Sequence, residues 1–225
     1  SHDLRTPLTS ISGNANNLLY NESCLDAQMR RQIYGDIYDD SMWLIDLVEN
    51  LLSVTRIEEG RMQISQSAEL DEVIREALKH TGQSRTGRTI KVEEEDELIL
   101  AKMDARLIVQ VLINLIGNAV KYTPQGTDIT VRVRKEKAEN GENSQVIISV
   151  CDLGDGIPDD RKERVFDMFY TGGDQVADSR RSLGLGLGLC RSIINAHGGK
   201  IWISDNIPHG AVVTFTLPAE EVALN

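Results

Sequence analysis

Two long stretches near the start of the chain repeat apolar residues at the spacing of a coiled-coil seam. Apolar side chains recur in steps of four and three over residues 4–18, and again over residues 33–54, where Asp40 interrupts them. Polar residues 21–23 separate the two seams, so we expect two antiparallel helices. Pairing two such hairpins into a four-helix bundle would bury both apolar stripes. The pattern predicts an α-helical hairpin that is half of a dimeric bundle; the alternative is a hairpin packed on the downstream domain of its own chain.

The pattern changes at residues 58–61, where two glutamates, a glycine and an arginine end the second helix. We place a domain boundary here and expect two domains, residues 1–60 and 61–225. The second contains short helical and alternating segments, which predict an α+β two-layer sandwich with helices on one face of a mixed sheet. Helices are expected over residues 70–80, 104–121, 161–166 and up to 196, and strands over residues 90–94, 99–102, 129–135 and 145–151 and near residues 201 and 212.

Composition excludes some partners. The chain has 225 residues, a net charge of -11 and a pI near 4.9, which disfavours nucleic acid and anionic membrane surfaces. Its three cysteines show no CxxC spacing and are expected to be reduced packing residues. No apolar run approaches 18 residues, so we expect this chain to be soluble. Because it opens one residue before a candidate nucleophile, we also expect it to be part of a longer protein.

The first residues, SHDLRTP, offer one nucleophile. In a helix, His2 and Thr6 lie on the same face, one turn apart. Asp3 is placed to hold the imidazole tautomer or to take its proton. Pro7 removes a backbone donor and is expected to loosen or bend the helix beside the nucleophile. A lone histidine near a chain end is usually a solvated surface residue, so these residues need support from elsewhere.

A helix beginning near Asp104 carries a second polar face. Asn114 and Asn118 lie four residues apart, and Lys121 and Tyr122 follow one turn later, so two amides and an ammonium group share one side. An exposed asparagine pair is most often only surface.

Two glycine-rich stretches follow. In DLGDGIP, Gly154 and Gly156 permit a tight turn, and Asp152 at a strand end is placed to accept the exocyclic amine of adenine. A calcium loop is the competing interpretation, but the spacing of the aspartates in residues 152–160 does not fit an EF-hand.

In GLGLGL, glycines alternate with Leu185 and Leu187 ahead of a helix. The backbone amides of Gly184, Gly186 and Gly188 would form an anion site for polyphosphate. The stretch does not follow a strand and no GxxxxGK[ST] string is present, which argues against a Rossmann fold or a P-loop.

The remaining signals are weaker. Residues 171–183 are polar and suit a mobile lid, in which Arg180 and Arg181 could meet phosphates, although an exposed arginine pair is commonly solvated surface. We interpret Phe166 and Phe169 as packing residues and His197 as a helix cap. No role is assigned to the turn at residues 208–210.

Taken together, HDLRTP, NLIGNAVKY, DLGDGIP and GLGLGL resemble the H, N, G1 and G2 boxes of HisKA-class sensor histidine kinases, in order and over nearly the whole chain. The resemblance implies an ATPase fold of the histidine kinase, gyrase and Hsp90 type. It implies autophosphorylation of His2, with Asn118 and Asn114 binding Mg2+ and Lys121 and Tyr122 near phosphate and nucleotide. Asn114 stands where the hydrolytic relatives carry a water-activating glutamate, which favours transfer to a protein over hydrolysis.

The resemblance also implies partners: a second copy of the chain and the receiver domain of a response regulator. Thr6 would then position water for dephosphorylating that regulator. Two stretches, DDSMWLIDLVENLLSVTRIE and DSRRSLGLGLGLCRSII, are particularly similar to the kinases that control bacterial potassium uptake. That similarity implies a membrane-anchored parent with this portion in the cytoplasm. A non-catalytic dimeric ATP-binding scaffold and an ATPase chaperone are the alternatives.

Overall fold

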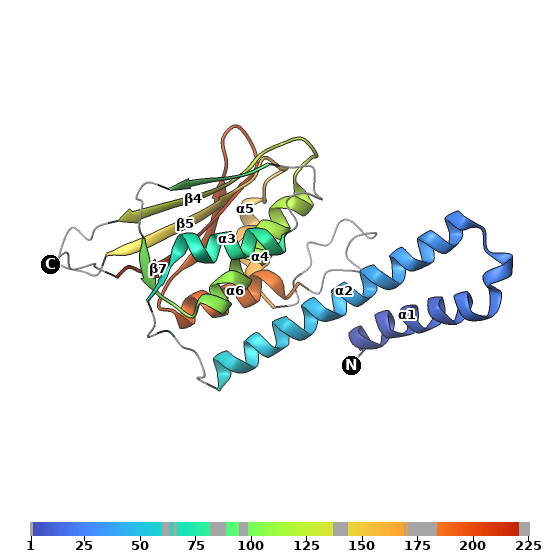
Figure 1. The fold of residues 1–225 in the computed structure, drawn as a ribbon. Helices are drawn as coiled ribbons and strands as arrows, with labels where there is room; N and C mark the ends of the chain where they lie inside the picture. The colour runs from blue at the N-terminus through green and yellow to red at the C-terminus, as the bar shows by residue number, and fades with distance from the viewer. Residues whose placement is uncertain are drawn as a thin grey trace. The chain divides into compact units, whose positions relative to one another are not determined.

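The chain divides into two compact units, residues 1–53 and residues 54–225 (Figure 1). The structure is a computed structural model, and it describes residues 2–59, 64, 67–81, 89–94, 99–136, 144–168, 170 and 184–220. The domain boundary after residue 60 stays a prediction.

The first unit is a helical hairpin. Its elements are α1 (His2–Asn21), the short 3-10 helix η1 (Glu22–Cys24) and the first part of α2 (Ala27–Glu58). In Figure 1, α1 runs back along α2. Asp26 caps α2, because its Oδ1 accepts a hydrogen bond from the Met29 amide at 2.7 Å. The two predicted helices and the polar break between them are confirmed.

Much of the apolar surface of the hairpin is exposed. Tyr20 is 79% exposed and Leu51, one of the predicted seam residues, is 63% exposed. A second row on α2, here called the outer stripe, is also exposed at helical spacing: Tyr34, Tyr38, Ile45, Val48 and Leu52. The hairpin therefore leaves apolar area for which it supplies no cover of its own.

The second unit is an α+β sandwich, as predicted. Its helices are α3 (Leu70–His80), α4 (Ala105–Tyr122), α5 (Asp159–Lys162), η2 (Arg164–Phe166) and α6 (Gly186–Ala196). Its strands are β1 (Ser67–Glu69), β2 (Ile90–Glu94), β3 (Leu100–Lys102), β4 (Ile129–Glu136), β5 (Gln145–Cys151), β6 (Ile201–Asp205) and β7 (Ala211–Pro218).

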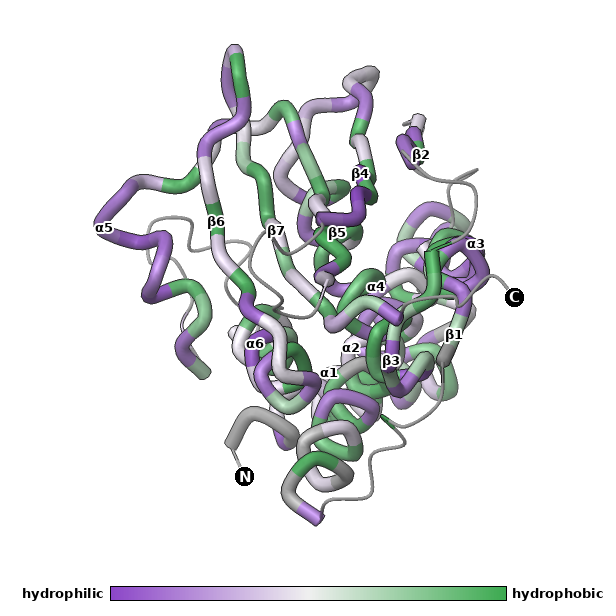
Figure 2. Tube along the Cα trace, turned by 90° about the vertical axis from the view of Figure 1, so that its left-hand side faces the viewer, coloured by the Kyte–Doolittle hydropathy of each residue, from purple (hydrophilic) through white to green (hydrophobic). Residues whose placement is uncertain are grey.

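The main sheet is mixed and has the order β2-β4-β5-β7-β6, with β2 parallel to β4 and the other neighbours antiparallel. Helices α3, α4 and α6 cover one face, as Figures 1 and 2 show. The strands alternate accordingly: Val131, Ile148 and Phe215 point to the helices and are fully buried. Helix α5, coloured as hydrophilic in Figure 2, lies beside β6, where Lys162 pairs with Asp205 at 2.7 Å.

Two features of the topology were not predicted. Strand β1 pairs with β3 in a separate two-stranded sheet, with Ala68 opposite Ala101. The parallel pairing of β2 with β4, with Val92 opposite Val131, was also missed. Both pairings join segments that are remote in sequence, and their registers leave no local pattern to detect.

Cys151 and Cys190 are buried, as expected of packing residues, but Cys24 is exposed, so that interpretation of Cys24 was wrong. Cys24 ends the polar η1 between the two helices, where no core is available. In the part of the chain that the structure describes, no helix combines the length and apolar character needed to cross a bilayer.

Candidate functional site

Helix α4 carries the polar face predicted for the site. The side chain of Asp104 caps the helix by accepting from the Leu107 amide, as expected from its position. Val111, Leu112 and Leu115 are buried in the core. Asn114 and Asn118 are half-buried and share the same side of the helix one turn apart.

The end of α4 meets the first glycine loop. A Cβ atom built on Gly154 would lie 2.6 Å from the carbonyl oxygen of Tyr122, so only glycine fits at this contact. Asp152 follows β5, and its Oδ1 accepts hydrogen bonds from the amides of Gly154 at 2.8 Å and Ala211 at 3.1 Å. The loop therefore holds the Asp152 carboxylate next to the C-terminal end of α4.

The second glycine loop meets α4 at Asn114, nearer the N-terminal end of the helix than the contact at Tyr122. The position of a Cβ on Gly186 lies 3.8 Å from Cγ of Asn114, an ordinary contact distance. Gly186 opens α6, and the first intrahelical bond of that helix runs from the Leu189 amide to the Leu185 carbonyl. The amides of Gly186, Leu187 and Gly188 therefore lie in the first turn, where helix amides point outward towards an anion.

Asn114 is unusual within this arrangement. Its Nδ2 is buried, and apart from a weak interaction of this amide with the Cys190 thiol it has no hydrogen-bond partner among the described residues. An unsatisfied buried amide costs about 1–3 kcal/mol, so its retention calls for a reason other than folding. An amide N–H held against a glycine loop and a helix N-terminus fits a site for phosphate, and the Oδ1 of the same side chain is the kind of oxygen ligand that a hard cation such as Mg2+ takes.

The other two glycines of GLGLGL have packing reasons. Gly184 has a φ of 62°, and a Cβ there would lie 2.3 Å from the Tyr170 carbonyl oxygen. A Cβ on Gly188 would meet Sδ of Met168 at 2.9 Å and the carbonyl oxygen of Phe166 at 3.2 Å. Gly186 is thus the member of the three whose open side faces the polar helix α4.

The other predicted residues are exposed, buried in the core or outside the described part of the chain. Lys121 is exposed and its Nζ lies 5.1 Å from the ring centre of Tyr122, which is itself 60% exposed. The predicted lid residues Arg180 and Arg181 lie outside the described residues, as does Phe169. Phe166 is buried, as predicted.

Two buried titratable groups lie on or next to the helices α4 and α6 that carry the site. Burial raises the pKa of the Cys190 thiol to about 12, so this cysteine stays protonated in the core. His197 is 3% exposed; its Nδ1–H donates to the Ile193 carbonyl at 2.7 Å, and its Nε2 accepts from the Asp104 amide at 3.0 Å. Burial lowers the pKa of His197, so the ring is neutral. His197 joins the end of α6 to the start of α4, which extends its predicted capping role.

The nucleophile predicted from HDLRTP belongs to the first unit. Helix α1 begins at His2 and continues through Pro7, so His2 and Thr6 lie one turn apart on it. Thr6 is exposed. The side chains of His2 and Asp3 lie outside the described part of the structure.

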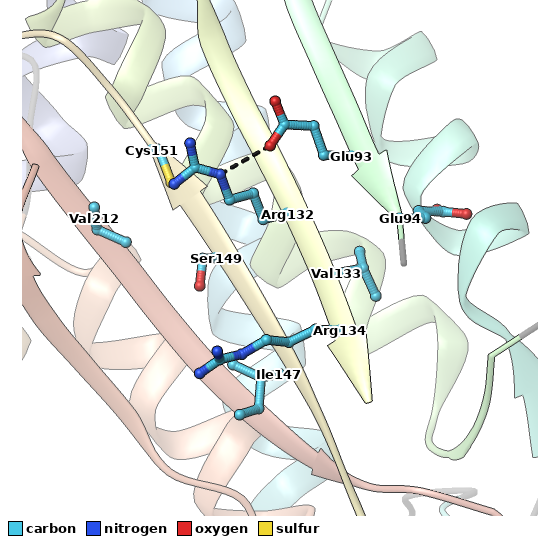
Figure 3. Close-up of a pocket in the computed structure, with 9 residues that line it drawn as sticks. All are labelled: Glu93, Glu94, Arg132, Val133, Arg134, Ile147, Ser149, Cys151 and Val212. Atoms are coloured by element: carbon cyan, nitrogen blue, oxygen red, sulfur yellow. Dashed lines mark hydrogen bonds and ion pairs between the residues drawn. The ribbon is translucent and has the colours of Figure 1, made fainter. Parts of the chain in front are cut away.

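A hollow of about 330 Å³ lies elsewhere, on the sheet face opposite the helices (Figure 3). Arg132 pairs with Glu93 at 2.9 Å across it, and Arg134 extends over Ile147. Burial raises the pKa of Cys151, which makes its thiol a poor nucleophile. None of the predicted site residues lines this hollow, and two of its charged residues, Arg132 and Glu93, pair with each other.

Sequence reasoning missed the contribution of the β6–β7 loop. Asn206, His209 and Gly210 each contact the turn formed by residues 152–154. The signal available in the sequence was the glycine that follows Pro208 and His209.

Two family models match the chain. Residues 1–60 match the His Kinase A (phospho-acceptor) domain, and residues 103–221 match the family described as histidine kinase-, DNA gyrase B- and HSP90-like ATPases.

Relatives span the whole chain. Sensor protein KdpD of Clostridium acetobutylicum is 40% identical over 98% of this chain and 24% of its own length. The adaptive-response sensory kinase SasA of Gloeothece citriformis is 32% identical over 97% of this chain and 56% of its own length. The chain thus spans between a quarter and a little over half of these curated relatives.

A solved structure gives the same result. The crystal structure of histidine kinase ThkA in complex with response regulator protein TrrA matches with a TM-score of 0.67 and 28% identity, over 97% of this chain and 59% of that one.

Proposed function

Because this chain belongs to the sensor histidine kinases and carries both their phospho-acceptor and their ATPase domains, we propose that it transfers the γ-phosphate of ATP to its own His2. The observation that carries the proposal is the double contact of α4, which meets one glycine loop at Tyr122 and the other at Asn114. The Asp152 carboxylate lies at one end of this face of α4 and the N-terminus of α6 at the other, and the face itself carries the Asn114 and Asn118 amides. This arrangement suits a purine at the Asp152 end and a polyphosphate at the α6 end.

We assign dimerisation and phosphotransfer to residues 1–60 and ATP binding to residues 61–225. The exposed outer stripe supports a homodimer, since the stripes of two hairpins would bury each other in a four-helix bundle. The net charge of -11 argues against nucleic acid as a partner.

The chemistry follows from the residues. Asp152 would accept the amine of adenine, and the α6 amides, with Lys121, Arg180 and Arg181, would meet phosphate. A nitrogen of the His2 imidazole would form a bond to the γ-phosphorus while the bond to the bridging oxygen breaks, and Asp3 would take the ring proton.

Asn118 and Asn114 would hold Mg2+, which supplies charge neutralisation when bound. Asn114 cannot act as a general base, which disfavours transfer to water.

A response regulator aspartate would receive the phosphate next. The similarity to ThkA, which was solved with response regulator TrrA, supports this partner. Thr6 would position a water molecule that later removes phosphate from the regulator. The similarity to KdpD supports control of potassium uptake by a membrane-anchored parent whose cytoplasmic portion includes this chain.

The test is incubation with γ-labelled ATP and Mg2+, with His2→Gln and Thr6→Ala alongside. We expect label that is acid-labile and base-stable, as a phosphoramidate is, and that is lost in His2→Gln. Thr6→Ala should keep this label but lose the dephosphorylation of a labelled regulator. ATP binding without any label, in a chain that dimerises, would instead support the non-catalytic scaffold, and steady phosphate release would support an ATPase.

A further inference from the structure

We propose that Asn206, in the loop between β6 and β7, is a positioning residue that sets the Asp152 carboxylate for recognition of adenine. The inference rests on the proposed function, in which Asp152 accepts the exocyclic amine of the base. It gives a role to a loop that the sequence left without one.

Asp152 uses its two carboxylate oxygens unequally. Both backbone amides that bind the carboxylate, those of Gly154 and Ala211, donate to Oδ1. Oδ2 is therefore the oxygen left to accept a hydrogen bond from a ligand. The two bonds to Oδ1 constrain the χ angles of the Asp152 side chain. The direction in which Oδ2 points therefore depends on how the backbone of Asp152 is held.

Asn206 holds that backbone. Its Nδ2 donates to the carbonyl oxygen of Asp152 at 2.7 Å, across 54 residues of sequence. Its Oδ1 accepts from the Ile207 amide at 3.0 Å, and its own amide donates to the Gly210 carbonyl at 3.0 Å. Both the nitrogen and the oxygen of the Asn206 side-chain amide are thus hydrogen-bonded. Flipping this amide would place its Oδ1 against the carbonyl oxygen of Asp152.

The rest of the loop closes on the same turn. Gly210 has a φ of 111°, and a Cβ there would lie 2.1 Å from the Asp152 carbonyl oxygen, so the two backbones are in direct contact. Nδ1 of His209 lies 3.1 Å from the Gly154 carbonyl, where a ring N–H donates. The loop therefore holds Asp152 from one side and Gly154 from the other.

Within this clamp, Asn206 is the residue whose side chain bonds the main chain of Asp152 itself. Removing its Nδ2 would leave the Asp152 carbonyl without that donor and free the peptide to rotate. The loss of one such hydrogen bond corresponds to roughly a fivefold to tenfold change in affinity. The effect should fall on the base and not on the phosphates, whose proposed contacts lie at α4 and α6.

The experiment compares the dissociation constants of MgATP and MgITP for the wild type, Asn206→Ala and Asn206→Asp. Inosine carries a carbonyl oxygen in place of the exocyclic amine, so ITP lacks the hydrogen that the amine of adenine would donate to Oδ2. Asn206→Asp keeps the size of the side chain and the acceptor for Ile207 if the alanine variant fails to fold. Asn195→Asp, at the exposed end of α6, controls for the added charge.

We expect both Asn206 variants to weaken ATP binding roughly fivefold to tenfold with ITP binding unchanged, so that the preference for ATP shrinks. Equal weakening of both nucleotides would mean that the loop is merely structural, and unchanged binding would mean that Asn206 is idle; either result overturns the inference. A wild type that binds ATP and ITP equally would overturn the role proposed for Asp152 as well, which separates the two failures.

Discussion

The two units of this chain treat their apolar residues in opposite ways. In the second unit, α4 and the sheet enclose side chains such as Ile108, Val111 and Leu112, which have no exposed area. In the first unit, apolar residues line α2 and remain about half exposed, as Tyr34 and Val48 do. One unit completes its core with its own strands and helices, and the other presents an incomplete one.

This difference separates folding from assembly. The buried core of the second unit is formed within one chain, so we expect its stability not to depend on protein concentration. An open stripe makes the order of the first unit depend on a partner surface, and the proposed dimer provides it through a second copy of the same stripe. The predicted consequence is that equivalent leucine substitutions have different effects in the two units.

The largest expected effect follows from Leu112→Ala. This leucine is fully buried in α4, so its truncation should lower the free energy of unfolding of the second unit by about 2–5 kcal/mol. The measurement is urea unfolding followed by the fluorescence of Trp202 in a Trp43→Phe background, because each unit contains one of the two tryptophans.

Leu52→Ala is the matched control in the first unit. It removes the same atoms from a side chain that is 52% exposed, so the unfolding of the second unit should change by less than about 0.5 kcal/mol. Sedimentation should instead show weaker dimerisation. Equal shifts of the Trp202 transition in the two variants would contradict the contrast between the units.

The same contrast explains what the sequence could predict. Helix α3 was predicted with the observed bounds, residues 70–80, because an amphipathic period is a local property. The seams of the hairpin were equally visible. The parallel pairing of β2 with β4 was not, since the partner of a strand is chosen by packing across the whole unit.

The candidate site divides along the same line. Asn114, Asp152 and Gly186 could be predicted as site residues because their residue types carry chemistry in recognisable strings. Asn206 was missed because a side-chain bond to a main-chain carbonyl 54 residues away leaves no mark on neighbouring residues. The three glycines of GLGLGL also differ in a way that the sequence does not reveal. A Cβ on Gly184 or Gly188 would clash with neighbouring atoms, whereas one on Gly186 would lie at an ordinary contact distance from Asn114.

A smaller effect tests the polar interior of the second unit. His197 bridges α6 and α4 as a neutral ring, and burial lowers its pKa below the ordinary value of 6.5. The unfolded chain therefore binds a proton below about pH 6.5 that the folded chain does not yet bind. The stability from this group is present above that pH and is lost as the pH falls towards the lowered pKa.

The measurement is the free energy of unfolding from about pH 7.5 to about pH 5.5, in the wild type and in His197→Gln. The variant should be less stable by about 1–3 kcal/mol at the higher pH, because the Asp104 amide and Ile193 carbonyl lose a partner. Its stability should then fall less steeply with acid than that of the wild type. His80→Gln, at the exposed end of α3, is the matched control for the loss of a histidine side chain. Parallel curves for the wild type and His197→Gln would contradict the assignment of this pH dependence to His197.

The smallest expected change in stability lies at Asn114, where the second unit buries a polar side chain. Its buried amide on Asn114 lacks a hydrogen-bond partner among the described residues, so Asn114→Leu should leave the free energy of unfolding within about 1 kcal/mol of the wild type, on the more stable side. The reverse exchange one residue later, Leu115→Asn, places an amide in the closed core and should cost more than about 2 kcal/mol. Labelling from γ-labelled ATP should be lost in Asn114→Leu despite its stable fold. A marked loss of stability in Asn114→Leu would mean that the amide serves the fold. Full labelling would mean that the amide binds neither metal nor phosphate. A residue retained for its ligand requires both results together, a stable fold and lost labelling.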